Sequence, residues 1–185
     1  QQNYVVSAHQ SGTALLNLIN SILDISKLEA GKVSLEHLPF NLLELLDEIC
    51  YLESEPAGRK GLDLNLIVSP EVPVQVIGDV DKLRQVLMNL VSNAIKFSDH
   101  GEVNISVVAR EVADGRASLE LVVQDTGIGM DEETQRRVFE PFVQADKSTT
   151  RKYGGTGLGL AISSQYVKQM DGTTQILSSP EKGTQ

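Results

Sequence analysis

The chain has 185 residues, with 16 Lys and Arg against 25 Asp and Glu, which gives a formal net charge of −9. This acidic balance excludes a broad basic surface for nucleic acid or for an anionic membrane, so a polyanionic ligand needs a local site. Hydrophobic residues make up 41% of the chain, there is one Cys, and no apolar run is long enough to span a membrane. These features are typical of about one soluble globular domain without a disulfide or a zinc cluster.

The first thirty residues predict one helix that ends near Gly31, because apolar residues recur every three or four positions: Leu15, Leu16, Ile19, Ile22 and Leu23. A single amphipathic helix cannot bury such a stripe by itself. Two interpretations remain open, a helix packed on its own domain and half of a severed helix bundle, and we favour the second.

The remaining elements follow from periodicity and turn residues. We expect a short strand at Val33–His37, a helix capped by Asn41 that ends near Pro56–Gly58, a strand at Leu62–Val68 and a long helix at Asp79–Phe97. A hairpin of Glu102–Arg110 and Ala117–Gln124 follows, then a helix at Asp131–Val138, a loop at Pro141–Thr156, a helix at Gly157–Met170 and a strand at Thr173–Ser178. Helices mixed with antiparallel strands, without regular βαβ alternation, favour an α/β two-layer sandwich over a Rossmann fold. The lone N-terminal helix and a C-terminal hairpin turn that lacks its return strand favour a piece of a longer protein.

The long helix carries the first candidate site. Gln85, Asn89, Asn93 and Lys96 fall within roughly 80° on one side of it. Asn is a poor helix former, so two Asn one turn apart in mid-helix indicate a function. An amide oxygen can ligate Mg²⁺, and a Lys can reach a phosphate. The alternative is a solvated helix face, for which Glu, Lys and Gln are the usual choice.

Two glycine-containing motifs follow. Asp125-Thr126-Gly127-Ile128-Gly129 comes directly after a strand, where an Asp can accept a hydrogen bond from an exocyclic amine and Gly lets a flat ring approach the backbone. Gly154–Leu160 opens a helix whose bare amides and dipole favour an anion. Taken alone, the first motif is a weak signal that is also compatible with a turn between strand and helix, and the second is also compatible with a flexible hinge.

In chain order, NLVSNAIKF (Asn89–Phe97), DTGIGM (Asp125–Met130), FEPF (Phe139–Phe142) and GGTGLGL (Gly154–Leu160) resemble the N, G1, F and G2 boxes of the histidine-kinase ATP-binding domain, HATPase_c, which has the Bergerat (GHKL) fold. LINSILDISKL (Leu18–Leu28) resembles the end of the second dimerisation helix of hybrid sensor kinases. The resemblance implies a mixed, mostly antiparallel sheet covered by about three helices. It also implies a partial dimerisation domain at residues 1–31, a catalytic domain at residues 32–185 and a lid at about 141–156.

The resemblance also assigns roles to single residues. Asn93 would ligate the Mg²⁺ that bridges the phosphates of ATP, with Asn89 as its support, and Lys96 would contact phosphate. Phe97 would line the adenine pocket, and Asp125 would accept the N6 amine of adenine. Thr184 would lie near the adenine. The remaining residues would allow close approach of the nucleotide or pack beneath it: Gly127, Gly129, Gly155, Gly157, Leu158, Gly159 and Leu160.

The reaction follows from one contrast with the family's ATP-hydrolysing members, which have a Glu where this chain has Asn89. Without that general base, attack by water should be slow, so the γ-phosphoryl group would pass to a His instead. His9, His37 and His100 lack the phosphoacceptor motif, so the acceptor would belong to another segment. The implied protein is a cytoplasmic, homodimeric sensor histidine kinase that uses ATP and Mg²⁺ and passes phosphate towards a receiver domain. The alternative is a regulatory module that binds nucleotide or a partner kinase without productive transfer.

Overall fold

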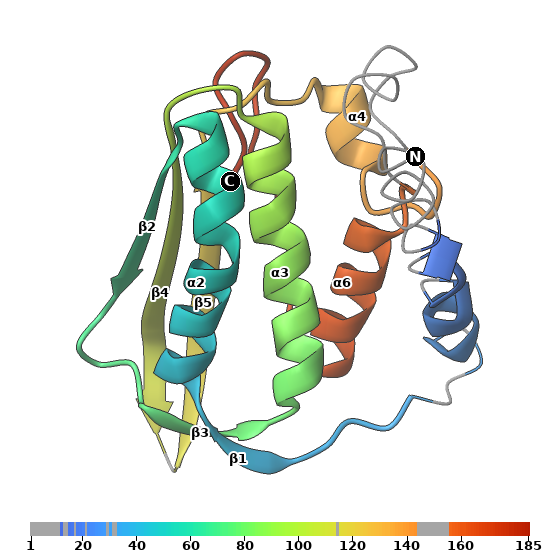
Figure 1. The fold of residues 1–185 in the computed structure, drawn as a ribbon. Coiled ribbons are helices and arrows are strands. Elements are labelled where there is room, and N and C mark those ends of the chain that lie inside the picture. The colour runs from blue at the N-terminus through green and yellow to red at the C-terminus, as the bar shows by residue number, and fades with distance from the viewer. Residues whose placement is uncertain are drawn as a thin grey trace.

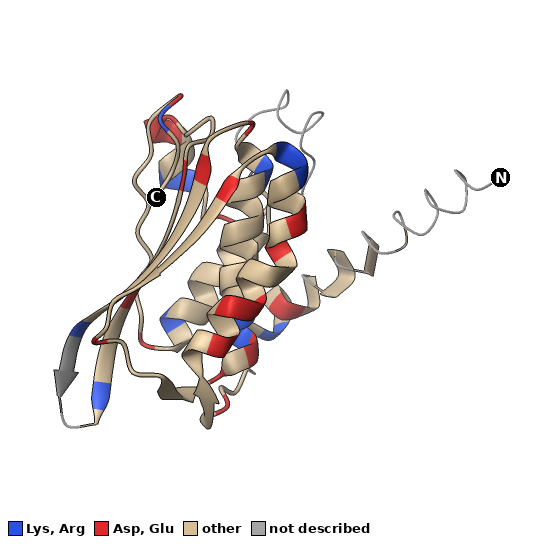
Figure 2. Ribbon diagram, turned by 60° about the vertical axis from the view of Figure 1, so that its left-hand side comes forward, with Lys and Arg blue, Asp and Glu red and all other residues tan. Residues whose placement is uncertain are grey.

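The computed structural model describes residues 12, 15–16, 18–20, 22–28, 30, 33–113, 115–143 and 156–185, with the backbone alone for 111–113. The chain forms two layers, with a sheet on one side and helices on the other, as Figure 1 and Figure 2 show from two directions. This arrangement confirms the predicted α/β two-layer sandwich.

The main sheet has three strands in the order β2-β4-β5. β2 (Asp63–Val68) pairs in parallel with β4 (Glu102–Ala113), and β4 pairs antiparallel with β5 (Arg116–Asp125). A separate antiparallel pair joins β1 (Leu38–Asn41) to β3 (Gln75–Gly78). The sheet is therefore mixed, as expected.

Three helices cover one face of the sheet: α2 (Leu42–Lys60), α3 (Val80–Phe97) and α6 (Gly159–Gln169) (Figure 1). The short helix α4 (Glu132–Arg137) lies at one end of the molecule. Apolar stripes of α2 and α3 pack on β4 in the main core, which includes Leu42, Leu46, Ile49, Leu87, Val91, Val103, Ile105 and Val107. The sheet and α2 thus fix the position of α3, which carries the first candidate site.

A second cluster joins α3 to α6 and to the N-terminal helix. Val86, Leu158, Ile162 and Tyr166 are buried there, and Leu18, Ile25 and Leu28 pack against them. The described residues between 12 and 28 are helical, as predicted. The N-terminal helix therefore packs one apolar stripe against α3 and α6.

Three sequence-based expectations were wrong in detail. The strand predicted at Val33–His37 lies at β1 instead, and β3 was not predicted; both strands have only four residues, too few for a clear alternation. α2 continues through Pro56 to Lys60, because Ala57 is buried and Lys60 binds α3. Thr173–Ser178 forms no strand, since within it only Ser178 makes a bridge, to Thr184.

Among the described residues, no helix has both the length and the apolar content that a membrane crossing requires.

Candidate nucleotide site

Asp125 lies at the end of β5, and two backbone amides hold its carboxylate. Its Oδ1 accepts from the N–H of Gly127 at 2.8 Å and from that of Thr184 at 3.2 Å. The Asp125 N–H in turn donates to the carbonyl of Thr184 at 2.8 Å. Burial raises the pKa of Asp125, and the two amide hydrogen bonds partly offset that increase. With Oδ1 occupied by the backbone, Oδ2 is the oxygen that remains for a ligand amine.

Glycines around Asp125 are required by close backbone contacts. A Cβ on Gly129, where φ is +64°, would lie 1.9 Å from the carbonyl oxygen of Ser179. A Cβ on Gly127 would lie 2.5 Å from the carbonyl oxygen of Phe97. These two glycines thus allow the β5–α4 segment to pack directly on the end of α3 and on the C-terminal hairpin. The role predicted from the sequence for these glycines, close approach of the nucleotide, stays a prediction.

On α3, two amide side chains are joined to each other and to α6. Asn93 Nδ2 donates to Asn89 Oδ1 at 3.2 Å, and Asn89 Nδ2 donates to Ser163 Oγ at 2.9 Å. Gly159 makes room for this contact, because a Cβ there would lie 2.2 Å from Asn89 Oδ1. Gln85, which shares the predicted face, instead donates to Asp24 of the N-terminal helix at 3.1 Å.

The start of α6 differs from the starts of α2, α3 and α4. Asn41, Asp79 and Asp131 cap α2, α3 and α4 with side-chain oxygens, whereas Leu158 precedes α6 without a side-chain cap. Leu158 is fully buried beneath this turn, and Leu160 is half-buried. A helix start of this kind, next to Asn89, leaves backbone amides for an anion.

Lys96 and Phe97 link the two ends of the site. Lys96 Nζ lies 4.8 Å from the centre of the Phe97 ring, and burial lowers the pKa of Lys96. The Phe97 carbonyl accepts from the N–H of Ile128 at 3.2 Å. The helix α3 therefore lies between two sets of contacts: Asn89 reaches Ser163 on α6, and Phe97 reaches Ile128 in the segment that follows Asp125.

Three residues that hold this arrangement were not predicted from the sequence. Lys60 Nζ donates to the carbonyls of Ile95, Lys96 and Ser98 at 2.8, 2.7 and 2.9 Å, and so closes the end of α3. Ser178 Oγ accepts from the N–H of Met130 at 2.8 Å. Ser163 anchors Asn89. Their partners lie 35 or more residues away in sequence, and no local pattern marks such contacts.

Parts of the predicted site lie outside the described residues: Gly155, and most of the lid at 144–155. His9 also lies outside them. The two ends of the predicted lid meet, because the Phe142 N–H donates to the carbonyl of Gly157 at 2.9 Å. Gly157 has φ +71°, and a Cβ there would lie 2.8 Å from the Val143 carbonyl.

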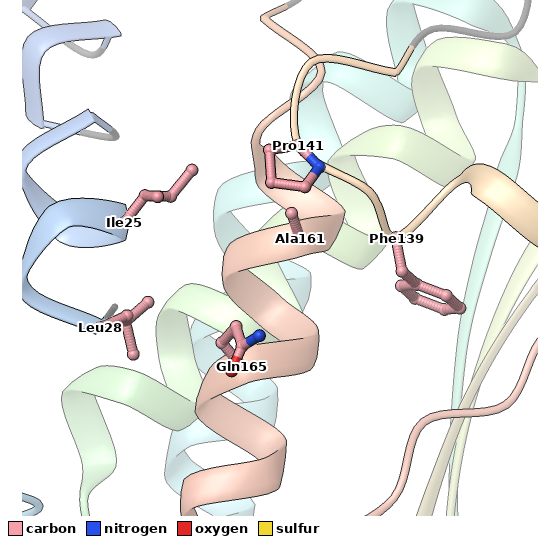
Figure 3. A pocket seen from close by; sticks show the side chains of 6 residues that line it. All are labelled: Ile25, Leu28, Phe139, Pro141, Ala161 and Gln165. Carbon is pink, nitrogen blue, oxygen red and sulfur yellow. The ribbon is translucent and has the colours of Figure 1, made fainter. Parts of the chain in front are cut away.

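A small pocket of about 100 Å³ lies apart from these residues, between the N-terminal helix, α6 and the segment of Phe139 and Pro141 (Figure 3). Ile25 and Leu28 line one side, and Pro141 and Ala161 line the other. It contains none of the predicted nucleotide residues, so we assign it to the packing of the N-terminal helix.

Comparison with known proteins agrees with this geometry. Residues 78–185 match the model of the family described as histidine kinase-, DNA gyrase B- and HSP90-like ATPase. The signal transduction histidine-protein kinase BarA of Escherichia coli K12 is 43% identical over 184 residues, and the sensor protein GacS of Pseudomonas syringae is 42% identical over 185 residues. Both alignments cover 100% of this chain and 20% of the relative, so the chain spans about a fifth of these relatives.

Among solved structures, full-length ShkA in complex with AMPPNP superposes with a TM-score of 0.84 at 33% identity, covering 100% of this chain and 37% of ShkA. The family match spans the boxes on α3, after β5 and at the start of α6, and the contacts described above bring these boxes together. The chain belongs to the histidine kinase-, DNA gyrase B- and HSP90-like ATPase family.

Proposed function

We propose that this chain is the ATP-binding catalytic part of a two-component sensor histidine kinase. It binds Mg-ATP and transfers the γ-phosphoryl group to a His of the dimerisation domain. The proposal rests on two observations: Asn89 and Asn93 meet the uncapped start of α6, and a half-buried carboxylate, Asp125, lies at the end of β5. The first feature would bind the phosphates of a nucleotide, and the carboxylate of Asp125 would bind its base.

The side chains present fit a magnesium ion that phosphates help to hold. Among the described residues, no three His, Cys, Asp or Glu gather as a metal cluster. Mg²⁺ is commonly bound by one or two protein oxygens together with substrate phosphates and water. The amide oxygen of Asn93 would be such a ligand, and the ion would neutralise phosphate charge during transfer.

Phosphoryl transfer depends mainly on positioning and on electrostatic stabilisation. Lys96 would place a positive charge at the phosphates, and the amides at the start of α6 would add fixed dipoles. Asn89 is neutral, and its amide is engaged by Ser163 and Asn93, so it does not act as a base for water. This supports transfer to a His over hydrolysis.

The N-terminal helix supports the proposed dimerisation and acceptor domain. One stripe of it docks on the second cluster, while large apolar side chains are exposed on the remaining surface: Leu15, Leu16, Ile19, Ile22 and Leu23. In a homodimer these residues would pack in a helix bundle.

An open groove between this helix and α3, lined by Asp24, Lys27 and Lys82, reaches Asn89. The acceptor His would come from the same domain, the cognate receiver would act downstream, and the reaction would take place in the cytoplasm.

The experiment is calorimetric titration of the chain with a non-hydrolysable ATP analogue, with and without Mg²⁺, and with the matching GTP analogue. We expect Mg²⁺-dependent binding that prefers adenine. Transfer of radiolabelled γ-phosphate to a separately supplied dimerisation domain, and loss of the label when its His is replaced by Ala, would then establish the reaction. Binding without transfer to any supplied domain would contradict the kinase assignment.

A further inference from the structure

Ser163 lies outside the sequence motifs, yet it is the buried end of a series of side-chain hydrogen bonds that runs from Asn93 through Asn89. It is on the second turn of α6 and only 3% exposed. Its hydroxyl accepts from Asn89 across 74 positions of sequence, and Asn89 accepts from Asn93. A buried polar group usually has such a partner, and here the buried hydroxyl of Ser163 meets the Nδ2 of Asn89.

The direction of the hydrogen bonds determines which atom Asn93 presents. Because Asn89 gives its Nδ2 to Ser163, its oxygen faces Asn93. Two amide oxygens facing each other would repel, so Asn93 donates a hydrogen bond from its Nδ2 to the Asn89 oxygen. The Asn93 oxygen is then the atom turned away from Asn89. Only oxygen can ligate Mg²⁺, because the amide nitrogen has no lone pair for a hard cation.

Gly159 contacts the oxygen of the Asn89 amide, while Ser163 contacts its nitrogen. The Asn89 oxygen lies where a side chain at Gly159 would begin, so the first turn of α6 packs directly on the Asn89 amide. Asn89 is therefore held between two residues one helical turn apart, Gly159 and Ser163. The helix α6, whose start is proposed to meet the phosphates, therefore also fixes the orientation of the Asn89 amide, which supports the metal ligand Asn93.

We infer that Ser163 is a positioning residue for magnesium: through Asn89 it holds the Asn93 amide with its oxygen available to the cation. This inference rests on the proposed function. Partners that orient a metal ligand typically contribute 10- to 100-fold to metal affinity. Ser163 itself touches neither nucleotide nor metal.

The test compares Ser163→Ala with Ser163→Thr, which keeps the hydroxyl, and with Ser164→Ala. Ser164 is the neighbouring serine on α6, and its hydroxyl lies 3.1 Å from that of Thr174, away from Asn89. In Ser163→Ala we expect affinity for the ATP analogue with Mg²⁺ to fall roughly 10- to 100-fold. Affinity without Mg²⁺ should change less than about twofold, since the relay acts on the metal ligand. Ser163→Thr and Ser164→Ala should behave as wild type.

A second measurement needs no nucleotide. The side-chain ¹H–¹⁵N signals of Asn89 and Asn93 should shift in Ser163→Ala and stay in place in Ser164→Ala. Unchanged signals would overturn the relay, and so would equal losses of affinity with and without Mg²⁺. If the signals shift but the wild-type chain gains no affinity from Mg²⁺, the relay exists and the proposed function has failed.

Discussion

The two ends of the proposed nucleotide site are held by different kinds of atoms. Around Asp125, backbone N–H and carbonyl groups of Gly127, Thr184 and Phe97 make the contacts, and glycines fit where a Cβ would clash. Around Asn93, side-chain amides and a hydroxyl make them. A backbone-held pocket is part of the fold, whereas a pocket held by side chains can change without the fold changing. Substitutions should therefore separate the two ends.

The largest effect is expected from Gly129→Ala, at the backbone-held end. Alanine at φ +64° costs about 1 kcal/mol, and displacing the Ser179 carbonyl adds about 1–3 kcal/mol. We expect the free energy of unfolding, measured with urea, to fall by about 2–4 kcal/mol. Gly58→Ala is the matched control: it lies inside α2 with no atom within 4 Å of a new Cβ, and it should be neutral or stabilising. If Gly129→Ala unfolds at the same urea concentration as wild type, the backbone around Asp125 can move to accept a Cβ, and this end is not fixed by the fold.

Asn93→Ala tests the opposite end. We expect Mg²⁺-dependent affinity for the ATP analogue to fall by roughly 100-fold or more, while the urea midpoint stays within error of wild type. Gln85→Ala, two turns earlier on the same helix, removes only the contact with Asp24 and should leave nucleotide binding unchanged. If Asn93→Ala binds Mg-nucleotide like the parent, Asn93 is not the magnesium ligand.

Asp125→Asn sharpens the assignment of the base. The substitution keeps an oxygen for the Gly127 and Thr184 amides but replaces Oδ2 with a donor, which opposes the N6 amine of adenine and suits the O6 of guanine. A lost hydrogen bond to a charged group corresponds to a loss of roughly 10- to 100-fold. We expect that loss for the ATP analogue and a smaller loss, or a gain, for the GTP analogue. Equal losses for both would show that Asp125 does not read the base.

Lys96 gives the phosphate end a pH dependence. Burial lowers its pKa below the ordinary value of 10.5, so nucleotide affinity should fall, by about tenfold, as pH rises through the lowered pKa and the ammonium is lost. Stability should move the other way: the folded chain releases this proton before the unfolded chain does, so the free energy of unfolding rises with pH in that window. Lys96→Arg stays charged and should flatten the affinity profile. An unchanged slope in Lys96→Arg would assign the dependence to another group.

The smallest effect is expected from Lys60→Met, which removes the three donors that close α3. We expect a loss of about 1 kcal/mol in the free energy of unfolding, from the carbonyl contacts and from the helix dipole. Arg59→Met is the control: it removes an exposed 3.8 Å ion pair with Glu55 and should change stability little. Equal effects of the two substitutions would assign no special role to Lys60.

The sequence predicted the elements that carry a long local pattern and missed those that depend on distant contacts. Long periodic segments such as α3, β4 and β5 were predicted close to their observed bounds, because a long pattern reports burial on one side. β1 and β3 were missed because four residues carry too little pattern, and the end of α2 because its contacts with α3 outweigh the penalty of Pro56. In the site, the motif residues could be found, and their assigned roles remain predictions. Lys60, Ser163 and Ser178 could not be found, since their roles depend on the tertiary arrangement.

The contact that joins the ends of the lid, from the Phe142 N–H to the Gly157 carbonyl, has a consequence for engineering. Once two points of a chain are pinned together, the entropy of closing the loop between them grows only with the logarithm of its length, by about 0.6 kcal/mol for each doubling. A reporter domain that replaces residues 144–155 should therefore connect Phe142 to Gly157 at little thermodynamic cost to the sheet. Such a reporter would begin and end at neighbouring points, two residues before α6 starts at Gly159 with the amides proposed to meet the phosphates.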